Sequence, residues 1–450
     1  ELTRLRAHAE FLEKKVELLE KENKFLREEN LLLRAKITSR NSSLPPSKDI
    51  TKSTKSNLSG RKPGDKKPGG QPDHKGSNLQ FRSTPDEVQD FKVEQCHFCK
   101  NDLTGIEQTI VDRQQVLDIP PVKPIVTEYV KYSVVCPCCN KLSSSVLPIK
   151  EVKSKIQYGQ QIRCWATYFN VRQVISKGRL QELFCDLFDL PISQGTITNM
   201  VAQSAAGMMG AYKHIKQHIQ TSRTVGSDET SCNISGTNFW LWAYQNLRAT
   251  FLYVHPSRGY KAIQSQFPEG FKNATLVTDR WAAQLKTPSD EKQLCLQHLI
   301  RDTQKLMDVY SSRWAAGMQK VLHQIIQLTH LKRIPIEKKG DIEQRLDDLL
   351  NAPLARSHLK IKTLQENLKS NQRAITTCLY QRYVPPTNNG TEQSVRKMKI
   401  KMKVAGCFRS EKGAEAYAVI QSIIDTAIKQ NIKPLLAIQN PDIICTQIAE

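Results

Sequence analysis

The sequence contains no uninterrupted apolar stretch near the roughly 18 residues that a membrane-spanning helix needs, so we do not expect a membrane protein. It also lacks the apolar block and small-residue cleavage site of a secretory signal, since its first residues carry charge and lead into periodic leucines. Both absences predict a cytoplasmic protein. In that reducing compartment the 12 cysteines are expected to be metal ligands or buried thiols rather than disulfides.

Acidic residues are also scarce relative to basic ones. The 450 residues include 66 Lys and Arg against 44 Asp and Glu, which gives a formal net charge of +22. An excess of this size usually indicates a polyanionic partner, and nucleic acid is the first candidate. The length allows several domains of about 100 to 200 residues each.

The N-terminal region carries a heptad repeat that runs without a break from Leu2 to Ile37. The d positions are Leu5, Leu12, Leu19, Leu26 and Leu33, and the a positions are Leu2, Ala9, Val16, Asn23, Asn30 and Ile37. Leucine at d with two asparagines at a favours a parallel pair, because each buried amide is satisfied only against its mate. We therefore predict a leucine-zipper coiled coil over residues 1–37 that makes the protein a homodimer. The alternative, a lone amphipathic helix, would show a wider apolar stripe.

The segment that follows is rich in Ser, Pro, Gly and Lys. Such a composition cannot bury enough apolar surface to fold alone, so residues 38–90 are predicted to form a basic flexible linker. Its lysines and arginines either hold a DNA backbone through salt-sensitive contacts or belong to a solvated spacer, and the sequence leaves both readings open.

Two CxxC pairs suggest a structural metal. Cys96 and Cys99 form the first pair, and Cys136 and Cys139 form the second. Four thiolates presented by two tight turns suit one tetrahedral Zn²⁺ ion. Between the pairs, residues 109–120 and 124–135 are β-rich, so residues 91–150 are predicted to form a zinc-ribbon-like module. Redox-active thiols are the alternative.

Residues 151–220 have a helical pattern. Two helices meet at a short turn around Pro191, and Ser193 is a good N-cap for the second. The pair is either a helix-turn-helix, whose second helix enters a major groove, or an ordinary helical hairpin. In the first reading this segment binds DNA, and the predicted polar contacts are Gln194, Thr196, Thr198 and Asn199.

Three acidic residues stand at the ends of predicted elements. Asp228 ends a β-like run that is followed by two apolar strands expected to pair consecutively, Asp279 ends a further buried strand, and Glu392 lies at a helix start. Three carboxylates within about 4 Å would repel by about 4 kcal/mol per pair, so a cluster would need a cation. Mg²⁺ ions held in this way would support phosphoryl transfer. The spacing alone does not establish such a cluster, because 44 acids offer many triples.

A basic cluster follows the third acid without an intervening acidic residue. Its members are Arg396, Lys397, Lys399, Lys401, Lys403 and Arg409. We predict that they contact DNA phosphates, with a solvated helix face as the alternative.

The order of several motifs resembles the insertion-sequence 66 family of bacterial transposases. These motifs are NSSLPPSKD, GGQPDHKG, the two CxxC pairs, YGQQIRCWATYFN, RLQELFCDLFDLPISQGTITNM, SDET, LVTDRWAA, CLQH, NNGTEQSVR and GCFRS. The resemblance implies an α/β RNase H-like catalytic domain over residues 221–430, with a helical insertion at about 285–385 and a tail at 431–450. It also implies that Asp228, Asp279 and Glu392 are the DDE triad that holds Mg²⁺ or Mn²⁺.

The same resemblance implies a nucleoid-associated DNA transposase. Such an enzyme binds the inverted terminal repeats of its element, cleaves the 3′ ends and transfers them into double-stranded target DNA, and accessory proteins of the element are further candidate partners. Cys295 and His298 occupy the places of a family Cys-x-x-His element. They are expected to brace the carboxylate strand, with a shared metal as the alternative. The rival function is a zinc-stabilised dimeric DNA-binding regulator derived from an inactive transposase.

Overall fold

The computed structural model describes residues 79–146, 154–354 and 357–448, together with residues 12–13, 15–17, 19–20 and 22–23. The chain divides into two units, one comprising residues 54–125 and the other residues 1–53 and 126–450. Each unit is described by itself. Among the described residues, no helix combines the length and the apolar character needed to cross a bilayer.

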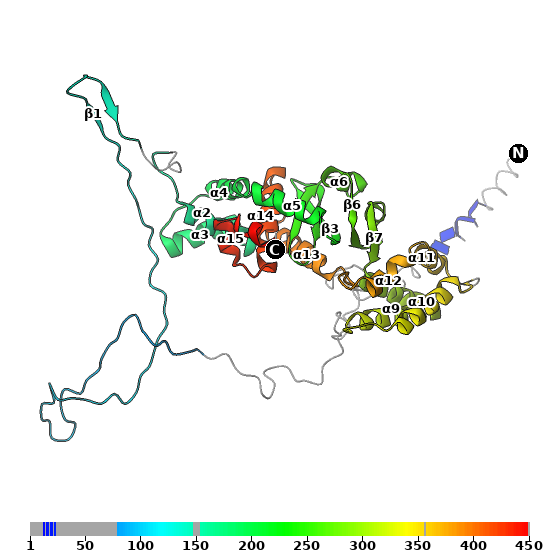
Figure 1. Ribbon diagram of the computed structural model, residues 1–450, viewed down its shortest axis with the longest axis horizontal. Helices are drawn as coiled ribbons and strands as arrows, with labels where there is room; N and C mark the ends of the chain where they lie inside the picture. Colours follow the sequence, from blue (N-terminus) through cyan, green and yellow to red (C-terminus); the bar gives the residue numbers. More distant parts are fainter. Residues whose placement is uncertain are drawn as a thin grey trace. The chain divides into compact units, whose positions relative to one another are not determined.

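A five-stranded mixed sheet forms the centre of the second unit (Figure 1). Its strands are β3 (Thr224–Ile234), β4 (Thr237–Gln245), β5 (Thr250–His255), β6 (Phe271–Thr278) and β7 (Ser289–Leu294). The order is β5-β4-β3-β6-β7, in which β3, β4 and β5 form an antiparallel meander and β6 and β7 run parallel to β3. A mixed sheet of this kind with packed helices is consistent with an RNase H-like α/β domain.

The sheet forms because its central strands are apolar on both faces. Leu241, Trp242, Ala243 and Tyr244 alternate between the two faces of β4, and all four are fully buried. The prediction that the two apolar strands after Asp228 pair consecutively is confirmed.

Helices cover the sheet. The longest, α14 (Glu411–Lys429), packs against β5, and α13 (Asn389–Ala405) packs against β3 and β4. On the edge strand β5, the hydroxyls of Ser422 and Thr426 in α14 accept hydrogen bonds from the backbone N–H groups of Leu252 and Thr250. Helix side chains thus satisfy donors that an edge strand would otherwise leave unpaired. Two short helices, α6 (Tyr260–Gln266) and α7 (Ala282–Leu285), flank β6 in the chain.

Five helices between β7 and α13 form a second hydrophobic core. They are α8 (Leu296–Tyr310), α9 (Arg313–Thr329), α10 (Ile336–Asn351), α11 (Leu359–Lys369) and α12 (Arg373–Tyr380). Met318, Leu322 and Leu346 are fully buried within this core. The predicted helical insertion therefore exists, but it begins after β7, a strand that the sequence did not predict because its first four residues are polar or charged.

The remaining helices flank the sheet in sequence. They are α2 (Gln160–Thr167), the π-helix η2 (Tyr168–Arg172), α3 (Lys177–Phe188), α4 (Gln194–Gly207), α5 (Met209–Gln220), α15 (Pro434–Gln439) and α16 (Ile443–Ile448). The predicted tail at 431–450 is thus largely helical. Ala437 and Ile444 are buried in the same core as the sheet, so these helices belong to the domain.

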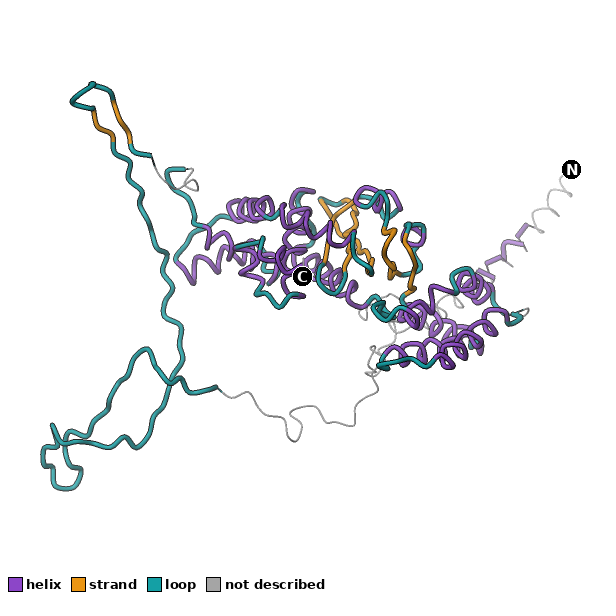
Figure 2. Tube along the Cα trace, in the orientation of Figure 1, coloured by secondary structure: helices purple, strands orange, loops and turns teal. Residues whose placement is uncertain are grey.

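The two β-rich segments expected within the zinc-ribbon-like module are mostly absent (Figure 2). Within the described range 79–132 no strand forms, and β1 (Ser133–Val135) pairs only with β2 (Leu142–Ser144). The side-chain amide of Gln115 instead makes both hydrogen bonds to the backbone of Arg82, and that of Gln108 does the same to Val93. The prediction of strands over 109–120 is therefore wrong, because the backbone there finds no backbone hydrogen-bond partner among the described residues.

Only part of the predicted coiled coil lies among the described residues. The described positions between 12 and 23 are helical, and Leu12, Val16 and Leu19 are about half exposed in the single chain, at 47, 54 and 49%. Exposed a and d side chains are what an unpaired zipper strand presents. The other heptads and most of the linker at 38–90 lie outside the described residues, so the coiled coil stays a prediction.

Gly226 in β3 lets α13 approach the sheet closely. A Cβ atom there would lie 2.4 Å from Oγ1 of Thr391 and 2.9 Å from Oδ1 of Asn388, and both of these side chains are buried. We predict that Gly226→Ala lowers the free energy of unfolding by about 1–3 kcal/mol through overpacking. Denaturant unfolding measures the change.

The matched control is Gly340→Ala in α10, where an added Cβ meets no atom within 4 Å. An alanine in an open helical position should stabilise by about 0.5–1 kcal/mol. A Gly226→Ala variant as stable as Gly340→Ala would show that the approach of α13 does not depend on this glycine.

Candidate active site

Strand register brings two of the predicted acids and Cys295 into one row. Gly226 pairs with Val277, and continuing this parallel register by two residues sets Asp228 level with Asp279. Likewise Thr278 pairs with Leu294, so the next residues, Asp279 and Cys295, are level as well. Asp228 in the middle of β3 thus lies level with the carboxyl ends of β6 and β7, where sites in α/β proteins tend to form. The expectation that Asp228 ends its strand is wrong, because β3 continues to Ile234 through its pairing with β4.

A loop that is anchored by the buried side chain of Asn388 carries the third acid to the same place. The side-chain amide of Asn388 donates to the carbonyl of Ser227 in β3 at 2.6 Å, and the backbone N–H of Asn388 donates to Sγ of Cys295 at 3.2 Å. Oγ1 of Thr391 donates to Oδ1 of Asn388 at 2.5 Å. Glu392 follows in the first turn of α13, as predicted, with its side chain only 13% exposed.

Two cationic side chains of α8 connect the acids. Nδ1 of His298 lies 2.9 Å from Oδ1 of Asp279, and Nε2 lies 3.6 Å from Oε1 of Glu392. One turn further along, the guanidinium of Arg301 lies 3.1 Å from the same Oε1 of Glu392 and 3.2 Å from Nε2 of His298. The bracing role predicted for His298 fits this position between two carboxylates.

Burial and mutual repulsion perturb the titrating groups of this cluster. Burial, reinforced by the neighbouring Asp279, raises the pKa of Asp228 to about 8. Burial alone would lower the pKa of His298, but Asp279 and Cys295 outweigh it and raise this pKa to about 10. At neutral pH the cluster therefore holds a protonated Asp228 and a cationic His298, and both compensate for concentrated negative charge.

The donors present suit a divalent cation. Although Oδ1 of Asp279 and Nδ1 of His298 lie within hydrogen-bonding distance, neither atom has a partner with hydrogen-bond geometry among the described residues, and both atoms are buried. His298 lies between Asp279 and Glu392, and the strand register sets Asp228 beside Asp279. Hard oxygen donors such as these carboxylates are the ligands that Mg²⁺ prefers. Asp228, Asp279 and Glu392 therefore fit the metal that the resemblance implies.

The structure also separates the two adjacent acids of the SDET motif. Strand alternation turns Glu229 to the opposite face from Asp228. There Glu229 pairs with Arg258 at 2.8 Å and accepts from Nε2 of Gln284 at 2.6 Å. The sequence analysis did not predict this pairing. Of the two acids in the motif, Glu229 therefore has a cationic partner, and Asp228 has no ion pair among the described residues.

Arg258 is held in turn by two aromatic rings. Its guanidinium lies 3.7 Å from the ring centre of Trp281 and 4.7 Å from that of Trp240, and its carbonyl accepts from Nε1 of Trp281. Trp281 belongs to the LVTDRWAA motif, where the aromatic residue gave a signal that we did not interpret. This stack fixes Glu229 on its side of the sheet.

Four of the six basic residues predicted to contact phosphate are exposed. The exposed residues are Arg396, Lys399, Lys403 and Arg409. Arg396 also pairs with Glu392 at 2.9 Å. Lys401 is buried, and its Nζ donates to the backbone carbonyl of Asn170 at 3.0 Å. Lys397 is half-buried and pairs with the buried Asp425. Lys397 and Lys401 are thus engaged by the protein interior, which corrects their predicted role as phosphate contacts.

The predicted helix pair before the sheet has the expected turn. Oγ of Ser193 accepts from the backbone N–H of Thr196 at 3.1 Å, which confirms the predicted N-cap of α4. Gln194, Thr198 and Asn199 are exposed and Thr196 is half-buried, so this face is available to a partner. DNA binding by these four residues stays a prediction, as does the choice between a helix-turn-helix and a plain hairpin.

Each CxxC pair forms the same turn. The backbone N–H of Lys100 donates to the carbonyl of Cys96, and that of Asn140 donates to the carbonyl of Cys136; both donors have a left-handed conformation. Backbone N–H groups directed at the first sulfur of each pair lower the pKa of Cys96 and Cys136. Such turns suit thiolate ligands. Zinc binding by Cys96, Cys99, Cys136 and Cys139 stays a prediction.

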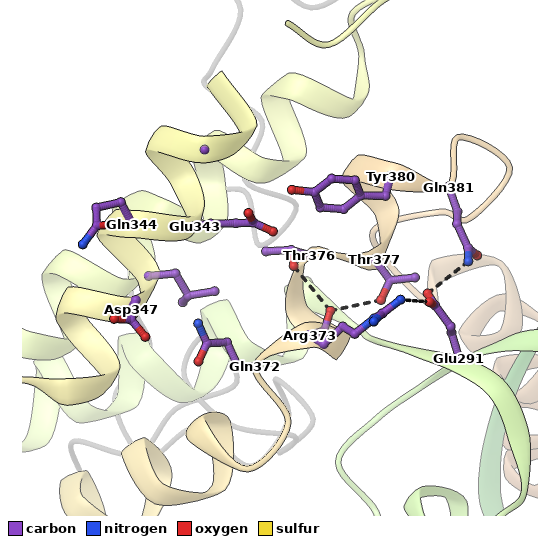
Figure 3. A pocket seen from close by; sticks show the side chains of 12 residues that line it. Glu291, Glu343, Gln344, Asp347, Gln372, Arg373, Thr376, Thr377, Tyr380 and Gln381 are labelled. Carbon is purple, nitrogen blue, oxygen red and sulfur yellow. Dashed lines mark hydrogen bonds and ion pairs between the residues drawn. The ribbon is translucent and has the colours of Figure 1, made fainter. Parts of the chain in front are cut away.

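A pocket of about 940 Å³ lies away from the three acids, and none of them lines it. Figure 3 shows Glu343 and Asp347 of α10 facing Arg373 and Tyr380 of α12 across this pocket. Arg373 pairs with Glu291 at the same place. The pocket is therefore a polar gap between the helical insertion and β7, distinct from the acidic cluster.

The raised pKa of Asp228 makes the stability of the metal-free protein depend on pH. The folded state keeps a proton that the unfolded state loses above the ordinary pKa of 3.8, so this stabilisation is complete below about pH 4 and is lost as the pH rises through about 8. The Asp228→Asn variant has no carboxyl proton to lose, so its stability does not fall in this way. We predict that its melting temperature exceeds that of the wild type by a difference that grows toward pH 8, at about 2–4 °C for each kcal/mol of lost stability.

Thermal unfolding in chelator at several pH values measures this margin, and addition of Mg²⁺ at pH 8 should stabilise the wild type more than the variant. Asp290→Asn, at an exposed position in β7, is the control. A wild type that gains stability between pH 5 and pH 8 relative to Asp228→Asn would contradict the assignment of Asp228 to a repulsive cluster.

The comparison with known proteins covers the sheet, the insertion and the acidic cluster together. Residues 155–416 match the family described as "Transposase IS66 family". No curated protein matches the chain. The matched span contains Asp228, Asp279, Glu392 and the Cys295–His298 element, whereas both CxxC pairs lie outside it. Because the match extends over more than half of the sequence, the chain belongs to the IS66 family of transposases.

Proposed function

We propose that the protein binds the inverted terminal repeats of its insertion sequence, hydrolyses the phosphodiester at the 3′ ends and joins those ends to target DNA. The observation that carries this proposal is the convergence of three acids from the middle of β3, the carboxyl end of β6 and the start of α13. The pairing of Asp279 with His298 and the raised pKa of Asp228 support it, because both reflect negative charge concentrated at this place.

Asp228, Asp279 and Glu392 would hold Mg²⁺ or Mn²⁺. A divalent cation bound there stabilises the charge that develops on the attacking and leaving oxygens of a phosphoryl transfer. Asp228 gives up its proton when it becomes a ligand. Arg301 and Arg396 fix the Glu392 carboxylate from two sides, so that its oxygens keep their position.

The two chemical steps balance at one site. In hydrolysis, water oxygen attacks the phosphorus, the P–O3′ bond breaks and the released 3′ oxygen takes a proton. In strand transfer, that 3′-hydroxyl loses its proton and attacks a target phosphorus, so one phosphodiester bond forms as another breaks. Both are in-line displacements at phosphorus, and a single carboxylate cluster serves them in turn.

The exposed basic residues of α13 and the segment after it are the proposed phosphate contacts. Arg396, Lys399 and Lys403 lie on the helix that begins with Glu392, and Arg409 follows it. A phosphate backbone held along this helix would therefore pass the acidic cluster. Gln194, Thr196, Thr198 and Asn199 of α4 are proposed as further contacts to DNA.

The rival function, a dimeric DNA-binding regulator without catalysis, predicts no need for the acids. A relic would not be expected to keep three converging carboxylates together with the cations that hold them. The hydrogen bonds that anchor Asn388, just before α13, to β3 and to Cys295 favour the enzyme for the same reason.

Glu392→Gln tests the catalytic role. The substitution keeps the size of the side chain and removes its charge, so we predict nearly unchanged binding to terminal-repeat duplexes and loss of Mg²⁺-dependent nicking by at least about 100-fold. Nicking of labelled oligonucleotides measures the second quantity.

The control is Glu366→Gln in α11, outside the acidic cluster, which should nick at the wild-type rate. Nicking by Glu392→Gln at the wild-type rate would remove Glu392 from the site. A parallel salt titration compares terminal-repeat with random duplexes, because specific binding survives salt that strips random DNA. If binding to terminal-repeat and random duplexes were equally sensitive to salt, and the wild type did not nick, both the transposase and the sequence-specific regulator would be contradicted.

A further inference from the structure

We infer that Asp279, Cys295 and His298 form a second metal site, one that takes a borderline transition metal such as Zn²⁺ in preference to Mg²⁺. The carboxylate, thiol and imidazole atoms of these residues all lie within 4.8 Å of one another. The three come from the end of β6, the end of β7 and the first turn of α8.

The spacing of these atoms is close to what a tetrahedral ion requires. Ligand distances of about 2.0–2.3 Å place neighbouring zinc ligands about 3.3–3.8 Å apart. The atoms of Asp279, Cys295 and His298 need to move by only about 1 Å to reach that arrangement from their present separations. The backbone also holds them, because the N–H of Cys295 donates to the carbonyl of Thr278 at 2.9 Å.

Two of the three donors face each other. Oδ1 of Asp279 and Nδ1 of His298 are buried and lie 2.9 Å apart, and outside this contact neither atom has a hydrogen-bond partner among the described residues. A metal ion that replaces the proton between them would bind both atoms. The sulfur of Cys295, in a residue only 1% exposed, accepts from the N–H of Asn388, which fixes its position beside them.

The surroundings of His298 resemble those of a metal-binding histidine. Such residues use one ring nitrogen for the metal and direct the other toward a carboxylate. Nδ1 of His298 faces Asp279, while Nε2 lies 3.6 Å from Oε1 of Glu392. With a metal on Nδ1, the proton resides on Nε2 and is directed toward Glu392. The guanidinium of Arg301, which lies 3.2 Å from Nε2 in this structure, would then turn away from that nitrogen and keep its bond to the Glu392 carboxylate.

The donor set determines which metal binds. Thiolate and imidazole select Zn²⁺ and similar ions, whereas Mg²⁺ takes oxygen ligands almost exclusively. Three protein ligands leave one position of a tetrahedral ion open. This distinguishes the site from the CxxC pairs, whose four sulfurs would close the coordination shell.

Because Asp279 belongs to both donor sets, the two metals compete for it. This consequence rests on the proposed function. A zinc ion bound by Cys295 and His298 draws Asp279 away from Asp228 and Glu392, so Zn²⁺ is expected to inhibit Mg²⁺-dependent nicking by withdrawing a ligand.

The experiment compares the metal content of full-length variants. Wild type, Cys295→Ser and His298→Asn are dialysed against buffered Zn²⁺, and bound zinc is measured after removal of free metal. Cys378→Ser, which alters a buried cysteine in α12, is the matched control. Zinc bound by the CxxC pairs is common to all four proteins, so the difference between variants is the quantity of interest.

We expect Cys295→Ser and His298→Asn each to bind about one equivalent of zinc less than the wild type and Cys378→Ser. Substitution of Co²⁺ should give the wild type additional thiolate-to-cobalt charge-transfer absorption that Cys295→Ser lacks. Equal zinc content in all four proteins overturns the inference. Circular dichroism checks that each variant is folded, and His298→Asn decides the matter if Cys295→Ser does not fold.

The same proteins separate this inference from the proposed function. Loss of zinc in the two variants, together with no nicking by the wild type in Mg²⁺, would support the metal site and reject the enzyme. Nicking by the wild type, together with equal zinc content in all the proteins, would support the enzyme and reject the metal site. Zn²⁺ that binds at Cys295 but leaves Mg²⁺-dependent nicking unchanged would overturn the competition for Asp279.

Discussion

The structure depends on holding several carboxyl groups close together in a poorly solvated place. Asp228 in the middle of β3, Asp279 at the end of β6 and Glu392 at the start of α13 come together where their charges repel. The protein compensates by protonating Asp228 and by placing His298 and Arg301 among the acids. This arrangement lowers the stability of the fold at a site that a cation would complete. Such unfavourable arrangements are common where function requires them.

Much of the scaffold around this site could be predicted from local pattern. The apolar runs of β4 and β5 and the strand before Asp279 predicted paired, buried strands, and Ser193 predicted a helix start, because these signals lie within a few neighbouring residues. The acids themselves were recognisable only through the order of motifs, since periodicity does not reveal which strand ends share an edge.

Contacts between distant residues account for the rest. Strand β7 is polar for most of its length and is recognised as a strand only by its pairing with β6. Lys401 reads as one more basic residue, yet it is buried against Asn170, 231 positions earlier. The strands expected over 109–120 failed for the opposite reason, because a suitable local pattern found no backbone partner. Local pattern therefore predicted single strands and helix starts better than burial or pairing between distant residues.

The most direct test of the central claim is to locate a bound metal. Crystals of the protein soaked in Mn²⁺ and measured near the manganese absorption edge reveal its position by anomalous scattering. The account predicts an ion coordinated by oxygens of Asp228, Asp279 and Glu392. Well-ordered carboxylates without an anomalous peak at saturating Mn²⁺, or a peak coordinated by other residues alone, would contradict it.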